Sequence, residues 1–370
     1  MNIALLTFHA SHNYGSVLQA YALSSVLRSL GHEVQILNLR TRAQRHAYRV
    51  FQVKGSGLKK LAHLLYTLYV TPARRRRFLN FEKFIRVCLP ISSETYSNGE
   101  ELAGTNFFDA YVTGSDQVWN PVCQDFDPAY YLNFADRKAK RVAYAPSLGR
   151  TEFNSDQLAL IRKLLTNVEW ISCREESGAE LLRTLTDRSV TVVCDPVLLP
   201  GQDFWSKFAV PPRDRSPYIL TYFLENNNGD KRHLQEIQRQ TGYRVISLNE
   251  DIRDWAKGYQ SAFDATPQEF VGLIQHASLV LTNSFHATAF STIFKRPFYT
   301  LCGRGTQEGN PNDCRKIDYL NRIGLSDRIL LTTQSLPPRN EWEQLDYVQP
   351  SKAMDVFRAL SRNYLTHALA

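Results

Sequence analysis

Residues 278–298, SLVLTNSFHATAFSTIFKRPF, combine a short strand, a polar elbow and a helix. An apolar run ending at Leu281 is followed by the polar residues 282–284, which can cap a helix, and then by apolar residues at a spacing of four. The N-terminus of a helix presents free backbone N–H groups and a positive partial charge, which suits an anion. His286 lies in that first turn. The stretch therefore predicts the reactive corner of an enzyme that handles a phosphorylated, anionic substrate.

The composition is typical of a folded globular protein, and the cysteines favour the cytoplasm. The chain has 370 residues, of which 43% are hydrophobic and 22% are charged, and this length predicts two domains or one large one. The sequence MNIALLTFHA begins a strand pattern directly, without the basic region of a signal peptide. No apolar run reaches the length of a membrane-spanning helix, about 18 residues. The six cysteines form no CxxC pair, which favours reduced thiols in the cytosol.

The positive charge is concentrated in residues 41–90. The net charge is +8, and this segment alone has twelve Lys and Arg residues against the single acid Glu82, so it carries +11 and the rest of the chain −3. Leucines at helical spacing between 58 and 68 add an apolar face. We expect a basic helical insertion that contacts a membrane surface or an acidic ligand. The alternative is a solvated charged face over a small satellite core; nucleic acid is not expected, because the basic residues are confined to one segment.

The remaining pattern alternates strands and helices. A strand at 2–8, a helix at 16–30 and a strand at 32–39 form a βαβ opening, without the GxGxxG of a dinucleotide site. A proline-rich linker at 200–217 separates a first Rossmann-like domain, 1–205, from a second, 215–350. A C-terminal helix at 351–370 could pack back on the first domain. Polar residues follow several of the strands, at the edge where open α/β sheets bind their ligands.

Six sequence blocks, taken in order, resemble one known family. They are NYGSVLQAYAL at 13–23, GSDQVWN at 114–120, YAPSL at 144–148, Arg174-Glu175 with Ser177, DPVL at 195–198 and NSFHA at 283–287. As an ordered set they resemble the polysaccharide pyruvyl transferase family. The resemblance implies a glycosyltransferase-B-like fold, in which two Rossmann-type halves face each other across a cleft. It also implies transfer of pyruvate from phosphoenolpyruvate onto sugar hydroxyls, which gives a pyruvate ketal and phosphate. Ala287 stands where many relatives carry Gly, and Asn283 where Asp is frequent.

This reaction requires an acid for the methylene carbon of phosphoenolpyruvate and a base for the attacking hydroxyl. With the resemblance, His286 is the candidate general acid; the alternative is a capping or core histidine. Asp116 is the candidate acceptor-side base or a ligand of sugar hydroxyls; the alternative is an aspartate that closes a turn.

The charges of the donor must also be neutralised. Arg174 follows a strand and could hold a carboxylate or phosphate with two hydrogen bonds, or could instead pair with Glu175 or Glu176. Arg315 resembles a late arginine of the family and follows a loop with Gly303, Gly305 and Gly309 that could cover the donor. Asn283 and Ser284 could donate hydrogen bonds to phosphate, cap the helix, or do both.

Several further residues are expected to bind the acceptor or line the cleft: Asn13, Tyr14, Gly15, Ser115, Gln117 and Trp119. Trp119 could stack on a sugar, although burial in the core is the commoner role of a tryptophan. His9 and His12 lack a nearby carboxylate at ligand spacing, so we expect no metal site. The reaction calls for no cofactor, since phosphoenolpyruvate is a substrate.

We therefore expect a cytoplasmic pyruvyltransferase that acts on a saccharide, either linked to a lipid or destined for a surface polymer. Residues 41–90 would hold it peripherally on the inner face of the membrane. Two alternatives are a nucleotide-sugar-dependent glycosyltransferase of the same architecture and a non-catalytic saccharide-binding relative. Stabilisation by a nucleoside diphosphate instead of phosphoenolpyruvate would indicate the glycosyltransferase. Stabilisation by neither compound would favour the non-catalytic relative.

Overall fold

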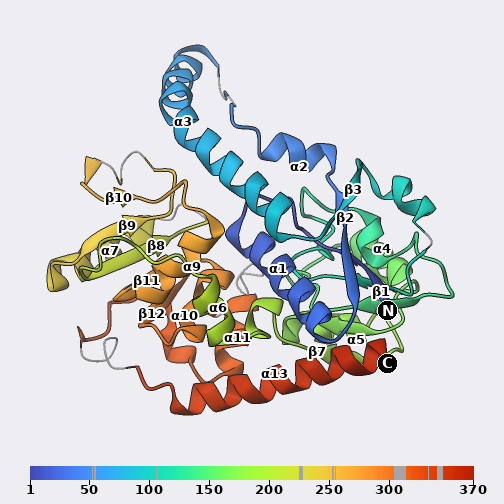
Figure 1. Cartoon of the computed structure of the whole chain (residues 1–370). Coiled ribbons are helices and arrows are strands. Elements are labelled where there is room, and N and C mark those ends of the chain that lie inside the picture. The colour runs from blue at the N-terminus through green and yellow to red at the C-terminus, as the bar shows by residue number, and fades with distance from the viewer. Residues whose placement is uncertain are drawn as a thin grey trace.

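The computed structural model describes residues 1–51, 53, 56–105, 107–224, 228–251, 254, 256–303, 314–331, 333–339 and 345–370. Two parallel sheets, one in each half of the chain, form its framework (Figure 1). The first has the order β3-β2-β1-β4-β5 and contains β1 (Asn2–Leu6), β2 (Glu33–Leu39), β3 (Ile91–Tyr96), β4 (Ala110–Thr113) and β5 (Lys140–Ala143). The second has the order β10-β9-β8-β11-β12-β13 and contains β8 (Tyr218–Tyr222), β9 (Arg244–Ser247), β10 (Gln260–Ser261), β11 (Leu279–Thr282), β12 (Phe298–Cys302) and β13 (Ile329–Leu331).

Both sheets have the strand order of a Rossmann fold. In each, the first three strands run outward from the centre and the fourth strand pairs on the other side of the first, so the order reverses between β1 and β4 and between β8 and β11. The strands are buried on both faces, which explains their continuous apolar sequences. A bridge from Val142 to Trp170 extends the first sheet toward the pair β6 (Ile171–Cys173) and β7 (Val190–Val192). The prediction of an α/β protein with two Rossmann-like, glycosyltransferase-B-like halves is therefore confirmed.

Helices connect and cover the strands. They are α1 (Tyr14–Ser29), α4 (Ser155–Leu165), α5 (Glu176–Arg183), α6 (Gln202–Phe208), α7 (Asn228–Thr241), α9 (Pro267–His276), α10 (Phe285–Ile293) and α11 (Cys314–Arg322). Capping boxes begin α4 at Asn154 and α9 at Thr266, so local sequence fixes where these helices start. The proline-rich segment expected to be a linker contains α6.

The two halves share apolar contacts. Tyr14 of α1 stacks on Phe270 of α9 with 4.3 Å between ring centroids, and Trp205 of α6 packs edge-on against Phe290 of α10 at 4.8 Å. Helix α13 (Val348–Leu369) runs back beneath both halves (Figure 1). There the Ser361 hydroxyl accepts a hydrogen bond from the backbone N–H of Cys194 at 2.8 Å. These contacts hold the two sheets in a fixed relation to each other.

Residues 41–90 form the short helix α2 (Arg42–Ala47) and the long helix α3 (Gly57–Cys88), which continues through Pro72. Strands β2 and β3, on either side of this segment, are parallel neighbours in the first sheet. The segment is thus the crossover between them, as parallel strands require, and the expectation of an insertion is not confirmed. The sequence analysis misses β3, whose residues ISSETY lack a continuous apolar run. No helix within the described residues is both long and apolar enough to cross a membrane.

Candidate functional site

A cavity of about 480 Å³ lies where the two halves meet. Its walls come from the segments that follow the four central strands, at the two points where the strand order reverses. The N-terminal half contributes Phe8, Ser11 and Asn13 after β1 and Asp116 and Gln117 after β4; the C-terminal half contributes Leu224 after β8 and Asn283 and Ser284 after β11. Open α/β sheets bind ligands at such reversal points, and here two of them face each other.

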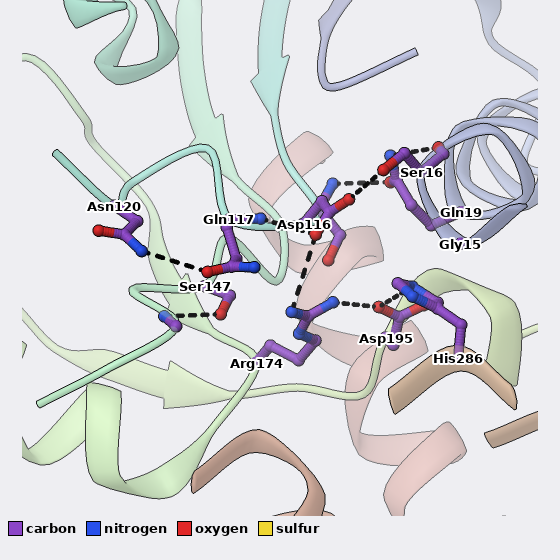
Figure 2. Close-up of polar contacts among 12 residues, drawn as sticks. Gly15, Ser16, Gln19, Asp116, Gln117, Asn120, Ser147, Arg174, Asp195 and His286 are labelled. Carbon is purple, nitrogen blue, oxygen red and sulfur yellow. Dashed lines mark hydrogen bonds and ion pairs between the residues drawn. The ribbon is translucent and has the colours of Figure 1, made fainter. Parts of the chain in front are cut away.

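His286 lies at the start of α10, on the wall of this cavity. Ser284 caps the helix, and its hydroxyl accepts a hydrogen bond from the Ala287 N–H at 3.5 Å. The imidazole is largely buried, and its Nε2 is 3.3 Å from the Asp195 carboxylate oxygen Oδ2. The structure thus places a histidine, a helix N-terminus and a carboxylate together at the edge of a cavity (Figure 2).

Gly15 lies directly against the His286 imidazole. A Cβ atom added at Gly15 would be 2.0 Å from His286 Nδ1, far closer than real Cβ atoms come to non-bonded atoms. Only glycine lets the first turn of α1 approach the ring this closely. Gly15 therefore contributes to the site by allowing this approach.

Arg174 lies behind the cavity and does not line it. Its Nη1 donates a 2.7 Å hydrogen bond to Asp195, its Nη2 is 4.0 Å from Asp116 Oδ1, and its side chain is only 2% exposed. The guanidinium also lies 4.6 Å from the centre of the Phe285 ring. Its Nε and Nη2 have no hydrogen-bond partner among the described residues, and because Arg174 is not part of the cavity lining, that it grips the donor directly remains a prediction. Its ion-pair partner is Asp195, with Glu175 farther away at 3.9 Å.

Asp195 occupies the centre of this arrangement. Burial by itself would raise the pKa of its carboxyl, but His286, Arg174 and the Val197 N–H together hold that pKa below its ordinary value. The carboxylate is thus an anion held between two basic side chains. Ser16, Asp116, Arg174, Asp195 and His286 form one continuous chain of polar contacts from α1 to α10 (Figure 2).

Asp116 lines the cavity from the N-terminal half, whereas His286 lines it from the C-terminal half. It has a positive φ of 70°, a conformation that non-glycine residues adopt rarely. The Ser16 hydroxyl donates to its Oδ2 at 2.5 Å, and the Gln117 N–H donates to its Oδ1 at 2.9 Å. These bonds fix a carboxylate at the cavity wall, as a base or a ligand of hydroxyl groups would require.

Basic groups extend the wall around His286. Arg315 and Lys316, at the start of α11, line the cavity, and Arg150 lines it from the N-terminal half. The Lys316 ammonium donates to the carbonyl oxygens of Asn283 and Leu301, both at 3.2 Å. The Arg315 Nε is buried and has no hydrogen-bond partner within the described residues. Gly303 also lines the cavity, whereas Gly305 and Gly309 lie outside the described residues.

Three residues expected at the cleft are packed elsewhere. Trp119 is buried, stacks on Tyr131 and donates from its indole N–H to the Tyr130 carbonyl at 2.9 Å. Tyr14 belongs to the apolar contact between the halves, and its hydroxyl donates to the Ala265 carbonyl at 2.7 Å. The Ser115 hydroxyl donates to the Ala145 carbonyl at 2.6 Å, beneath the Asp116 turn. All three support the site from within the core without lining the cavity.

The sequence analysis did not assign Asp195, Ser16, Lys316, Arg150 or Asp125 to the site. Asp195 follows a strand, a signal that could have found it. Asp125 lines the cavity and accepts a hydrogen bond from the Ser11 hydroxyl at 3.3 Å. Burial, and secondarily the nearby Asp116, raise the pKa of the Asp125 carboxyl above its ordinary value. No sequence motif marks this residue, because its position depends on the fold of a loop.

No group of three or more His, Cys, Asp or Glu side chains is placed to hold a metal ion, as far as the described residues go. His9 bonds instead to Asn38 at 3.0 Å, and His12 pairs with Glu82 at 2.9 Å. That the reaction needs neither a metal nor a cofactor remains a prediction.

Comparison with known proteins identifies the family. No curated protein is similar enough to match this sequence. Among solved structures, the fold is similar to the E. coli heptosyltransferase WaaC with ADP-2-deoxy-2-fluoro heptose, at 13% identity and a TM-score of 0.41, over 96% of this chain and 99% of that one. It is also similar to the UDP-GlcNAc 2-epimerase from Neisseria meningitidis bound to UDP-GlcNAc, at 11% identity and a TM-score of 0.48, over 100% of this chain and 99% of that one. The sequence model of polysaccharide pyruvyl transferases matches residues 13–301. The chain therefore belongs to the polysaccharide pyruvyl transferase family.

Proposed function

We propose that this protein transfers pyruvate from phosphoenolpyruvate onto two hydroxyls of a saccharide, forming a pyruvate ketal and releasing inorganic phosphate. The main support is the polar chain from Asp116 through Arg174 and Asp195 to His286, beside a cavity with walls from both halves. Membership of the family supplies the reaction class, and the cavity supplies groups of the required kinds.

The donor would bind on the C-terminal wall. Arg315, Lys316 and the N-terminus of α10 offer positive charge and N–H donors to its phosphate and carboxylate. His286 would then give a proton to the methylene carbon, so that the neighbouring carbon becomes cation-like and open to attack. Asp195 would stabilise the protonated imidazole before the transfer.

The acceptor would bind on the N-terminal wall. Asp116 would take the proton of the first sugar hydroxyl as its oxygen bonds to the cation-like carbon. The second hydroxyl would then displace phosphate from the same carbon and lose its own proton. The two hydroxyl groups lose two protons in total. One of them makes up for the proton that His286 gives to the methylene carbon, and the other leaves with phosphate, so the reaction balances without an oxidant or reductant.

The acceptor we propose is a saccharide linked to a lipid or otherwise destined for a surface polysaccharide. The same proposal places the protein in the cytoplasm, in peripheral contact with the inner face of the membrane through residues 41–90. A carrier lipid would present the sugar from that surface.

The test is incubation of the purified protein with phosphoenolpyruvate and a panel of glycans and lipid-linked saccharides. We expect the release of phosphate to match the formation of a product that carries one pyruvate ketal, detected as an increase in the mass of the acceptor. We also expect phosphoenolpyruvate to raise the melting temperature of the protein. Stabilisation by a nucleoside diphosphate but not by phosphoenolpyruvate, with sugar transfer, would instead identify a glycosyltransferase. Absence of turnover and of stabilisation by either compound would indicate a saccharide-binding protein without this activity.

A further inference from the structure

Helix α3 exposes one continuous stripe along its length. Eight residues at spacings of three or four are all exposed, and this spacing places them on one side of the helix. The stripe consists of four leucines, one proline and three cations, with no acid: Leu61, Leu65, Leu68, Pro72, Arg75, Leu79, Lys83 and Arg86. At about 1.5 Å per residue it extends for roughly 38 Å.

The other side of α3 holds the helix in place. Arg74 forms two hydrogen bonds with the Glu250 carboxylate, at 2.8 and 2.6 Å, and Arg77 donates to the Phe263 carbonyl at 2.7 Å. Phe81 and Phe84 are buried against the first half. The same side lines a second cavity of about 310 Å³, which shares Tyr48 with the candidate site. The stripe is therefore not needed to attach the helix to the rest of the protein.

Exposed apolar residues are concentrated in this part of the molecule. Of the fifteen large apolar residues exposed within the described chain, seven lie between Phe51 and Val87, about a tenth of the sequence. Leu61, Leu65 and Leu68 are 54%, 61% and 55% exposed and lie on the end of α3 that projects from the body (Figure 1). Single exposed leucines need no explanation, but a contiguous row on a projecting helix indicates a binding surface.

The charges around the row favour an anionic lipid surface as its partner. Residues 41–90 carry twelve cations and one acid, and no acid among the described residues pairs with Arg75, Lys83 or Arg86. A second copy of the chain would bring the same excess of positive charge and be repelled, while nucleic acid offers no apolar region for four leucines. A lipid surface accepts both groups: leucines enter the acyl boundary, and cations bind the headgroup phosphates.

We infer that the outward stripe of α3 docks this protein on an anionic lipid surface, with the helix lying in the plane of that surface. No residue of the stripe lines the candidate site or the second cavity, so docking leaves both accessible. The inference deepens and rests on the membrane contact proposed above for residues 41–90, but it does not depend on the proposed reaction, because binding to lipid can be measured without any substrate.

Vesicle flotation tests the inference with the full-length protein. We expect binding to vesicles of phosphatidylcholine with phosphatidylglycerol and little binding to phosphatidylcholine alone. The triple variant Leu61→Ser, Leu65→Ser, Leu68→Ser should bind at least about tenfold more weakly. The triple variant Arg75→Gln, Lys83→Gln, Arg86→Gln should bind about a hundredfold more weakly, at about fivefold per cation.

The matched control replaces exposed apolar residues on the opposite side of the molecule, Val356→Ser with Leu360→Ser on α13. This variant should bind as the wild type does, and all variants should keep the wild-type melting temperature because the replaced residues are exposed. Equal binding of the wild type and both α3 variants would overturn the inference, as would equal weakening by the α13 control. A wild-type dimer that the leucine variant converts to a monomer, without any vesicle binding, would identify a second copy as the partner instead.

Discussion

The two walls of the cavity have the same architecture and different charge. Each wall is built at the reversal point of a parallel sheet with Rossmann strand order. The C-terminal wall contributes His286, Arg315 and Lys316 and, among its described residues, no acid. The N-terminal wall contributes Asp116 and Asp125, together with one arginine.

Under the proposed function, this difference would divide one reaction between the two halves of a repeated fold. A donor with phosphate and carboxylate groups fits the basic wall, and hydroxyl groups that must lose protons fit the wall with carboxylates. The strand order determines where each wall lies, and the loops and first helical turns near the strand ends determine which charge it carries.

The largest effect should come from the basic wall. His286→Ala removes the proposed proton donor, so kcat for phosphate release should fall by about a thousandfold or more. The control is His276→Ala, at the end of α9 and outside the cavity lining. Turnover within about tenfold of the wild type in the His286 variant would rule out its proposed role.

Removal of the Asp195 charge, behind the basic wall, should destabilise the folded protein. Asp195→Asn leaves the buried Arg174 guanidinium without its closest carboxylate, and the free energy of unfolding at pH 7 should fall by about 3 kcal/mol. Because the folded-state pKa of Asp195 is lowered, its contribution is present above the ordinary carboxyl pKa and is lost as the pH falls through the folded value. The difference in unfolding free energy between the variant and the wild type, measured by urea denaturation, should therefore become smaller in acid.

The matched control for this comparison is Asp355→Asn, an exposed member of an ion pair on α13. We expect it to change the unfolding free energy by less than about 1 kcal/mol. An Asp195 variant as stable as this control would contradict the account of a buried, charge-paired carboxylate.

The contact between the walls can be disturbed without changing any charge. Gly15→Ala would place a methyl group where the His286 imidazole lies, so the ring must move and kcat should fall about tenfold or more. Gly104→Ala is the control, because a Cβ atom there meets nothing within 4 Å. Equal activity of the two variants would show that the position of the ring is not critical.

The smallest effect should come from Asp125, one of the two carboxylates of the acidic wall. The folded-state pKa of Asp125 is raised by burial, so its ionised form costs stability, and that cost grows as the pH rises through the carboxyl range. Asp125→Asn should therefore raise the melting temperature slightly at pH 7, by about 2 °C at most, with no gain at low pH. A lower melting temperature at pH 7 would show that the carboxylate stabilises the fold.

Much of the framework follows from local sequence. The strand β11 and the helix α10 were predicted from an apolar run, a capping serine and a period of four, all of which lie within one short stretch. The clustering of Asp116 with His286 also follows from general rules, because both come after central strands of parallel sheets.

Other features depend on contacts between distant residues. The pairing of Arg74 with Glu250 joins positions 176 residues apart, so the sequence could not show which side of α3 faces the protein. Trp119 and Arg174 have side chains suited to binding, yet tertiary packing encloses both. Local pattern indicates which residues could act, and burial decides which of them can reach a ligand.

The most direct test of the central claim is titration calorimetry of phosphoenolpyruvate with two variants, one from each wall. Arg315→Gln removes a charged donor from the basic wall and should weaken binding about tenfold or more. Asp116→Asn removes a carboxylate from the acidic wall and should leave phosphoenolpyruvate affinity unweakened while turnover is lost. Weakened binding in the Asp116 variant, with unchanged binding in the Arg315 variant, would contradict the division of donor and acceptor between the two walls.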